Sequence, residues 1–456
     1  MVREEKNTFI KIFLIFIIIQ PILDILTYVS ITQFKTSITI GIIARVLFML
    51  ISLLYIFLIN QHPEKQKVIL YLITLFVVLG FSFVFNYFTK PSFNFFSEAQ
   101  FIVKTIYFPV MFSTLFLLIE SSNRRKDVQQ QLIRAVVIAM VILSVSLFAA
   151  ILTNTANPTY THTKFGFTGW FYAGNETSAI VAISFPIVLI YAMLKTNQWK
   201  DLIHWLPAFL LAFVALLIGT KVSFFAVIAT IIIALLMNGW NAFRQKRKQG
   251  LRILLMNSLL MIGIFAIAPF SPSYQNIVGD YNHINEAKET EMKSTEENKE
   301  NRVEKKTNQK DTDPFLQSAL VKRILSSRNI YFEDIYVDYK EAGLVHKLFG
   351  LGYAGFYKED PKLIEMDFFD WFFSYGVLGF VLLMLPFIAL LWRVIQACFR
   401  DFLAFLRTEN ILLCAATGLG IGVAFLAGHV LYAPAVSIYL AIAFALLYSL
   451  NKKLLN

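Results

Sequence analysis

The chain has 456 residues, of which 57% are hydrophobic, only 16% are charged and 45 are phenylalanine. Soluble domains average about 45–50% apolar and about 25% charged residues, so this composition excludes a soluble enzyme and a disordered chain, and two cysteines exclude a disulfide scaffold. The net charge of +11 does not indicate nucleic acid binding, because the basic residues separate apolar runs, as they do in membrane proteins.

Apolar segments recur along the whole chain, and about 20 such residues suffice for one transmembrane helix. We predict an all-α polytopic membrane protein in which residues 1–270 form nine transmembrane helices, 271–365 a long external loop and 366–456 three more helices. The twelve predicted spans are 9–29, 38–59, 68–88, 101–119, 132–153, 174–194, 202–219, 222–237, 252–270, 368–395, 411–431 and 435–450.

The short loops predict how these helices are oriented. Most of their Lys and Arg residues lie on the side of both termini, whereas the opposite side has only Lys35, Lys90, Lys164 and Lys221. Cytoplasmic loops carry such an excess, so we expect a plasma-membrane protein with both termini in the cytoplasm. The first apolar run lacks a small-residue cleavage site, and we expect it to remain as a helix.

The long external loop has two parts of different composition. Residues 283–313 are rich in Glu, Lys, Asn and Thr and have few large apolar side chains, so we predict that they are disordered. Residues 315–342 have apolar side chains at helical spacing, which predicts two short amphipathic helices joined near Ser327 and Arg328.

Polar and ionisable residues inside or beside the spans lie toward the external half. Such residues are costly in a bilayer and mark functional sites by default. The set comprises Asp24, Arg45, Lys104, Asn175, Glu176, Lys221, Asp367, Asp370 and His429. Their one-sided distribution predicts a single polar cavity that opens toward the outer leaflet.

Each of these residues also has a purely structural interpretation. Lysines and carboxylates near helix ends can extend to the interface, and a carboxylate at a helix start favours the helix dipole. These alternatives concern Lys104, Lys221 and Asp367 as interfacial side chains, Asp24 with Arg45 as a packing pair, Glu176 as a helix-start carboxylate, His429 as a packing histidine and Arg328 as a surface arginine.

Several short motifs resemble those of the O-antigen ligase and Wzy-type polysaccharide polymerase superfamily, in particular its Gram-positive branch. The segments are GWFYAGNETSAIVAISFPIVL with Asn175, IGTKVSFFAVIATIIIALL with Lys221, SSRNIYFEDIYV with Arg328, LFGLGYAGF with Gly350 and Gly352, EMDFFDWFFSYGVLGF with Glu365, and AGHVLYAP. Lys221 stands where the family usually has arginine, and Glu365 stands where it usually has histidine.

The resemblance implies a GT-C-like glycosyltransferase that polymerises or ligates undecaprenyl-diphosphate-linked glycans at the outer membrane face. It implies inversion at the anomeric carbon, no metal and no cofactor. The expected partners are the lipid-linked donor, a glycan or cell-wall acceptor and the bilayer, without nucleic acid. The product would be a cell-surface polysaccharide such as a capsule, an exopolysaccharide or a teichuronic-acid-like polymer.

The chemistry of such a transfer assigns roles to the candidate residues. Negative charge develops on the leaving diphosphate, and fixed cations stabilise it, arginine through two hydrogen bonds and lysine as a point charge. The diphosphate candidates are Arg328 and Lys221, supported by Arg45, Lys104 and Arg323. The acceptor hydroxyl needs a base, for which the candidates are Glu365 or else Asp367, Asp370 or His429. Substrate binding is assigned to Asn175, Glu176 and Asp24.

Two other functions fit a polytopic chain. A lipid-linked glycan flippase or other transporter would handle similar substrates, but carriers usually have repeated halves with binding residues at the bilayer midplane. This chain has no visible repeat, and its charges lie toward one face. A non-catalytic scaffold of a polysaccharide-export complex would tolerate alanine at all of the candidate residues.

Overall fold

The computed structural model describes residues 2–36, 38–160, 164–245, 248–282, 328–357 and 361–455, which are mostly helical. Eleven helical segments are long and apolar enough to cross a membrane, and the bent pair α1–α2 makes a twelfth. This confirms the predicted all-α polytopic fold. The long segments are α1 (Val2–Ile18), α2 (Gln20–Thr32), α3 (Ile40–Leu54) with the π-helical turn η1 (Tyr55–Ile59), α4 (Lys65–Thr89), α5 (Phe95–Glu120), α6 (Arg125–Leu152), α7 (Gly174–Lys195), η2 (Trp199–Trp205) with α8 (Leu206–Leu217), α9 (Lys221–Gln245), α10 (Lys248–Ile267) with η3 (Ala268–Phe270), α15 (Asp367–Arg400), α17 (Thr408–Leu426) and α18 (Pro434–Leu455).

The remaining elements are short. A two-stranded antiparallel ribbon precedes α7, and several helices belong to the connections. They are β1 (Asn157–Pro158), β2 (Phe167–Gly169), α13 (Arg328–Glu341), α14 (Leu344–Phe349), α16 (Phe402–Phe405) and a helix over 272–282.

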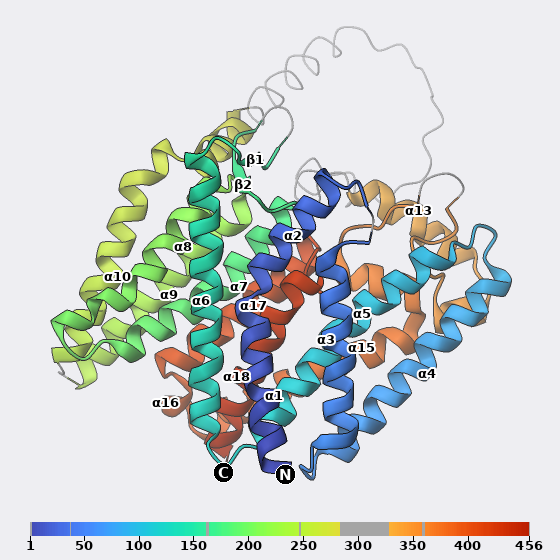
Figure 1. The fold of residues 1–456 in the computed structure, drawn as a ribbon, viewed down its shortest axis with the longest axis horizontal. Helices are drawn as coiled ribbons and strands as arrows, with labels where there is room; N and C mark the ends of the chain where they lie inside the picture. The colour runs from blue at the N-terminus through green and yellow to red at the C-terminus, as the bar shows by residue number, and fades with distance from the viewer. Residues whose placement is uncertain are drawn as a thin grey trace, which may run out of the picture.

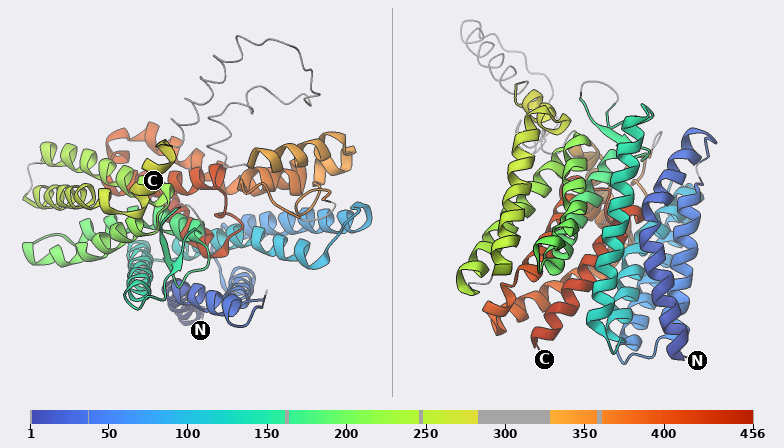
Figure 2. Two further views of the ribbon diagram at one scale, coloured as in Figure 1. Left: turned by 90° about the horizontal axis from the view of Figure 1, so that it is seen from above. Right: turned by 60° about the vertical axis from the view of Figure 1, so that its left-hand side comes forward.

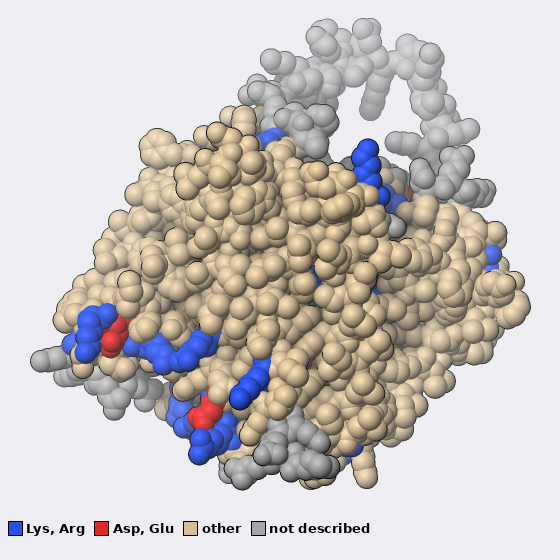
Figure 3. Space-filling model, viewed as in Figure 1, with Lys and Arg blue, Asp and Glu red and all other residues tan. Residues whose placement is uncertain are grey.

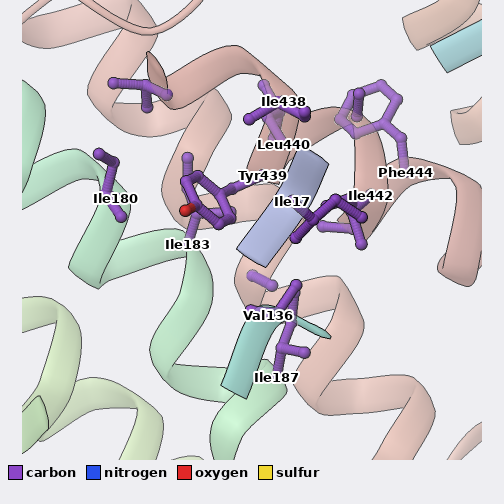
Figure 4. Packing of buried hydrophobic residues seen from close by; sticks show 14 of the residues in the cluster. Ile17, Val136, Ile180, Ile183, Ile187, Ile438, Tyr439, Leu440, Ile442 and Phe444 are labelled. Atoms are coloured by element: carbon purple, nitrogen blue, oxygen red, sulfur yellow. The ribbon is translucent and has the colours of Figure 1, made fainter. Parts of the chain in front are cut away.

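Helices α5, α7 and α18 form the centre of the bundle, and the other long helices pack around them (Figure 1). A helix that is apolar on all sides is expected to be buried. Side chains from α1, α6, α7 and α18 interlock there, as Figure 4 shows for Ile17, Val136, Ile183 and Tyr439, all of which are fully buried. Both chain ends lie at the same end of the bundle (Figure 1), which we call the termini end.

The outer helices expose apolar side chains. Helices α4 and α10 lie on opposite sides of the bundle (Figure 2), and Leu70 and Val77 on α4 and Ile262 on α10 are each more than 60% exposed. Figure 3 shows a broad band with few charged side chains and Lys and Arg grouped toward the termini end. A bilayer would cover this apolar band.

Two predicted spans are broken. The first bends by 51° between α1 and α2, where Pro21 interrupts the helix. The tenth breaks at Gly376, whose φ of +64° favours glycine. The connection that precedes α15 meets that helix at this break, because Leu351 N donates to Phe373 O at 2.9 Å and Gly352 N donates to Ser374 O at 3.1 Å.

Two further boundaries differ from prediction. Helix α17 ends at Leu426 and not near 431, because Gly428 and His429 both have positive φ and end the helix. The connection expected to begin at 271 starts with a helix over 272–282. Part of the second predicted amphipathic stretch is observed as α13, whereas 283–313, 315–327 and Arg323 lie outside the described residues.

Candidate functional site

A cavity of about 690 Å³ lies among α2, α3, α5, α7 and the segment 427–433. The ends of these elements that face it are those opposite the termini end (Figure 1). The cavity brings together five predicted site residues, namely Asp24, Arg45, Lys104, Glu176 and His429. Asp24 and His429, which are 405 positions apart in the sequence, therefore share one polar cavity inside an apolar bundle.

Arg45 is held in the wall of the cavity by α2. Its Nη2 lies 2.5 Å from Asp24 Oδ1, and its Nε donates to Gln20 Oε1 at 3.0 Å. Arg45 is 5% exposed and Gln20 is fully buried, so both need these partners. The ion pair joins α2 to α3 and neutralises most of the charge that Arg45 brings to the cavity.

Lys104 on α5 and Glu176 on α7 lack such partners. Both line the cavity, and within the described part of the chain neither forms a hydrogen bond or an ion pair. The hydroxyl groups of Tyr107 and Tyr432, two other lining residues, are also buried without a hydrogen-bond partner there. A buried polar group without a partner is costly. These groups are therefore available to a polar ligand.

Arg328, Glu365 and His429 form a second cluster that adjoins the cavity through His429. Glu365 Oε2 lies 3.5 Å from Arg328 Nη2 and 3.7 Å from His429 Nε2. Arg328 Nη2 also donates to the carbonyl of Ala427 at 3.2 Å. Helix α13, in the connection that precedes α15, is thereby attached to the segment that carries His429.

Glu365 and His429 are both in the left-handed region of the backbone, with φ of +62° and +61°. Such conformations are strained for residues other than glycine and persist where surrounding contacts enforce them, often at functional sites. Here the contacts come from two buried carboxylates. Asp370 accepts from the Ile364 and Met366 amides, and Asp367 accepts from those of Val430 and Leu431, all within 3.1 Å.

Asp367 and Asp370 therefore position the backbone on either side of the Arg328–Glu365–His429 cluster. Their side chains are almost fully buried, and neither residue lines the cavity. Of the four carboxylate and histidine candidates for the base, only His429 lines it. Which of them acts as a base stays a prediction.

The two titratable members of the cluster shift each other's pKa. The contact with the His429 imidazole lowers the pKa of Glu365, and burial opposes this effect only in part. Burial by itself lowers the pKa of His429, but the contact with Glu365 and the nearby Glu176 outweigh it and raise that pKa. Each of the two groups thus stabilises the charged form of the other.

Lys221 lies neither in the cavity nor in the adjoining Arg328–Glu365–His429 cluster. It lies at the start of α9, and its Nζ is 2.9 Å from Asp280 Oδ2, which also contacts Lys164 at 2.9 Å. These contacts lower the pKa of Asp280, although burial, the largest influence on it, acts in the opposite direction. Asn175 is exposed at the start of α7 and does not line the cavity either.

Several residues of the cavity and its wall were not predicted, and for three of them the spacing in the sequence offers a signal. Gln20 precedes Asp24 by four positions, and Gln100 and Tyr107 flank Lys104 by four and three positions. Residues so spaced share one helix face. A polar stripe along one face of an otherwise apolar helix therefore indicates a buried site.

Among the described residues, no group of three or more His, Cys, Asp and Glu side chains is placed to hold a metal ion. No curated protein matches the chain. A family match extends over residues 6–453, which is almost the whole sequence. The chain therefore belongs to the family described as O-antigen ligase like membrane protein.

Proposed function

We propose that this protein transfers a glycan from a polyprenyl-diphosphate donor, with undecaprenyl as the lipid, to an acceptor glycan of the cell surface. Family membership supports a membrane glycan ligase or polymerase in general. The observation that best supports a diphosphate donor is Lys104, a cavity cation that forms no hydrogen bond or ion pair within the described ranges, although Glu176 of the same cavity acts on it electrostatically. A bound phosphate would supply the directly paired anion that Lys104 lacks.

The diphosphate would lie between Lys104 and the Arg328–Glu365–His429 cluster. Arg45 is less available, because Asp24 already pairs with it at 2.5 Å. When the sugar–phosphate bond breaks, negative charge grows on the leaving diphosphate, and a fixed ammonium group in a partly dry site stabilises it. The unpaired hydroxyl groups of Tyr107 and Tyr432 would donate to the same substrate.

His429 would take the proton of the acceptor hydroxyl. Its Nε2 faces Glu365, so the carboxylate would hold the proton on that nitrogen and leave the other nitrogen as the base. The acceptor oxygen then forms a bond to the anomeric carbon as the bond from that carbon to the phosphate oxygen breaks. One sugar–oxygen bond replaces another, the proton stays on His429, and inversion results from a single displacement.

The cavity would face the outside of the cell. Lys and Arg of the short loops are concentrated at the termini end, which supports a cytoplasmic location for that end. The cavity lies toward the opposite end. A donor delivered to the outer leaflet could then enter from the lipid, and a capsule-like or wall-linked acceptor from the aqueous side.

The test is glycan transfer by the purified protein in liposomes that contain the lipid-linked donor and a soluble acceptor. We expect transfer without net movement of the lipid across the bilayer. The Lys104→Met variant should lose about 10²–10³-fold in rate, as is typical when one stabilising donor is removed. The control is Lys126→Met, an exposed lysine at the termini end. Lipid movement without transfer would contradict the proposal and support a flippase.

A further inference from the structure

A second, mainly apolar groove of about 260 Å³ lies on the membrane-facing surface near the termini end. Its walls come from α4, α5, α15 and α18, and it shares no lining residue with the site described above. The apolar walls are formed by Val68, Phe112, Phe116, Leu385, Pro386 and Ala389. A slot of this kind in the apolar band fits a hydrocarbon chain.

Charged groups stand at the end of this groove that is nearest the membrane surface. Lys67 lies there beside Glu64 at 3.0 Å and is 80% exposed. Beside the groove, Arg393 Nη2 donates to Oη of the lining residue Tyr448 at 3.0 Å, and its guanidinium lies 5.0 Å from the centre of that ring. The two cations outnumber the one carboxylate, and Lys452 also acts on Glu64, so the mouth is positively charged.

A polar group deeper in the wall lacks a partner. The hydroxyl of Tyr71 is buried and has no hydrogen-bond partner within the described ranges. Tyr71 follows Lys67 by four positions, so the two residues share one face of α4 and lie about 6 Å apart along its axis. Cation, hydroxyl and apolar slot thus follow one another from the membrane surface inward.

This order matches the order of groups in a phospholipid, whose phosphate is followed by an ester oxygen and then by an acyl chain. We propose that the groove binds one phospholipid with an anionic headgroup from the leaflet next to the termini. The phosphate contacts Lys67 and Arg393, and an ester carbonyl accepts a hydrogen bond from Tyr71. The acyl chain packs between α4 and α15. A zwitterionic headgroup brings its own cation and gains less from the positive mouth.

The lipid would fasten α4 at an end where it has few other polar contacts. At its opposite end α4 is held by the connection that precedes α15, because Ser82 Oγ donates to the Phe349 carbonyl at 2.6 Å and Asn86 Nδ2 donates to that of Gly350 at 3.3 Å. Helix α4 is also among the least buried of the spans. A bound lipid therefore acts as a structural ligand of the bundle.

The experiment measures lipid retention by the full-length protein in detergent. Native mass spectrometry and thermal melting are recorded with added phosphatidylglycerol or phosphatidylcholine. We expect one retained phosphatidylglycerol per chain and about fivefold weaker retention of phosphatidylcholine, since one basic residue near a membrane surface contributes about 1 kcal/mol. Phosphatidylglycerol should also raise the melting temperature more than phosphatidylcholine does.

Variants then locate the site. Ala389→Trp fills the slot and should abolish retention, whereas the matched control Leu391→Trp, on the same helix at a position 59% exposed to lipid, should keep it. Lys67→Gln and Tyr71→Phe should each weaken retention of phosphatidylglycerol. These two variants test the site if Ala389→Trp does not fold. Unchanged retention in these three variants, or equal retention of both lipids, would overturn the proposal. Displacement of phosphatidylglycerol by undecaprenyl phosphate would also overturn it and assign the groove to a polyprenyl chain.

Discussion

Among the described residues, buried charge is paired at one end of the bundle, whereas two charged side chains in the cavity near the other end form no ion pair. At the termini end, Glu120 is buried, but its Oε2 lies 2.7 Å from Lys452 and 3.3 Å from Arg125. In the cavity near the opposite end, Lys104 and Glu176 have no such partners among the described residues. A charge inside a bilayer is expensive. A paired cluster fastens helices together, whereas unpaired charges in a cavity are retained for a ligand.

The largest effect on glycan transfer is expected from a substitution at His429, which lines the cavity. His429→Ala should reduce glycan transfer about 10²–10⁴-fold, the usual contribution of a general base, with little change in thermal stability. Transfer rates and melting curves of the two proteins measure both quantities. A variant that transfers at the wild-type rate would show that the proton goes to another group.

At the termini end, where Glu120 is paired, a substitution should lower stability rather than glycan transfer. Glu120→Gln leaves Lys452 and Arg125 facing a neutral amide, which should lower the free energy of unfolding by about 1–3 kcal/mol. Thermal unfolding in detergent measures this loss. The protein that remains folded should transfer glycan at close to the wild-type rate, and a specific loss of transfer would mean that the cluster belongs to the reaction.

The pH dependence of transfer tests the link between Glu365 and His429. A base must be neutral, so transfer should rise as the pH passes the raised pKa of His429. Glu365→Gln removes a contact that raises this pKa, so the rise should begin at lower pH. Rate profiles of wild type and variant show the shift, while Glu365→Asp should restore part of the original profile. If the pH midpoint of the transfer rate were the same in Glu365→Gln as in the wild type, Glu365 would not set the pKa of His429 and the proposed coupling would be wrong.

The smallest effect is expected at Lys221. Its partner Asp280 is also contacted by Lys164, and a partly exposed ion pair contributes about 0–1 kcal/mol. Lys221→Met should therefore change stability and transfer only slightly. The same transfer assay checks this expectation, and a loss as large as that of Lys104→Met would return Lys221 to the diphosphate site that its motif predicts.

Hydropathy predicted the spans well, because helix length and apolar composition follow from the thickness of the membrane. It did not predict the break at Pro21 or the early end of α17, where His429 adopts a positive φ. Such local backbone geometry is set by packing, here by the hydrogen bonds that Asp367 accepts from Val430 and Leu431.

The site was predicted in part for a similar reason. The depth of a residue in the bilayer follows from its position along a span, and Arg45, Lys104 and His429, which were placed at similar depth, do line one cavity. Their roles stay a prediction. The rotation of each helix about its axis cannot be read in this way. Lys221 therefore has a suitable depth but contacts Asp280, which lies in a helix that the sequence did not predict.

The most direct test of the proposed diphosphate site is equilibrium binding of undecaprenyl diphosphate to the purified protein, without an acceptor. Lys104→Met should weaken binding at least about tenfold, the effect of losing roughly 1.4 kcal/mol of interaction. Lys126→Met should bind as the wild type does. Equal affinity of all three proteins for the diphosphate lipid would contradict the account, because Lys104 would then have no part in holding the donor.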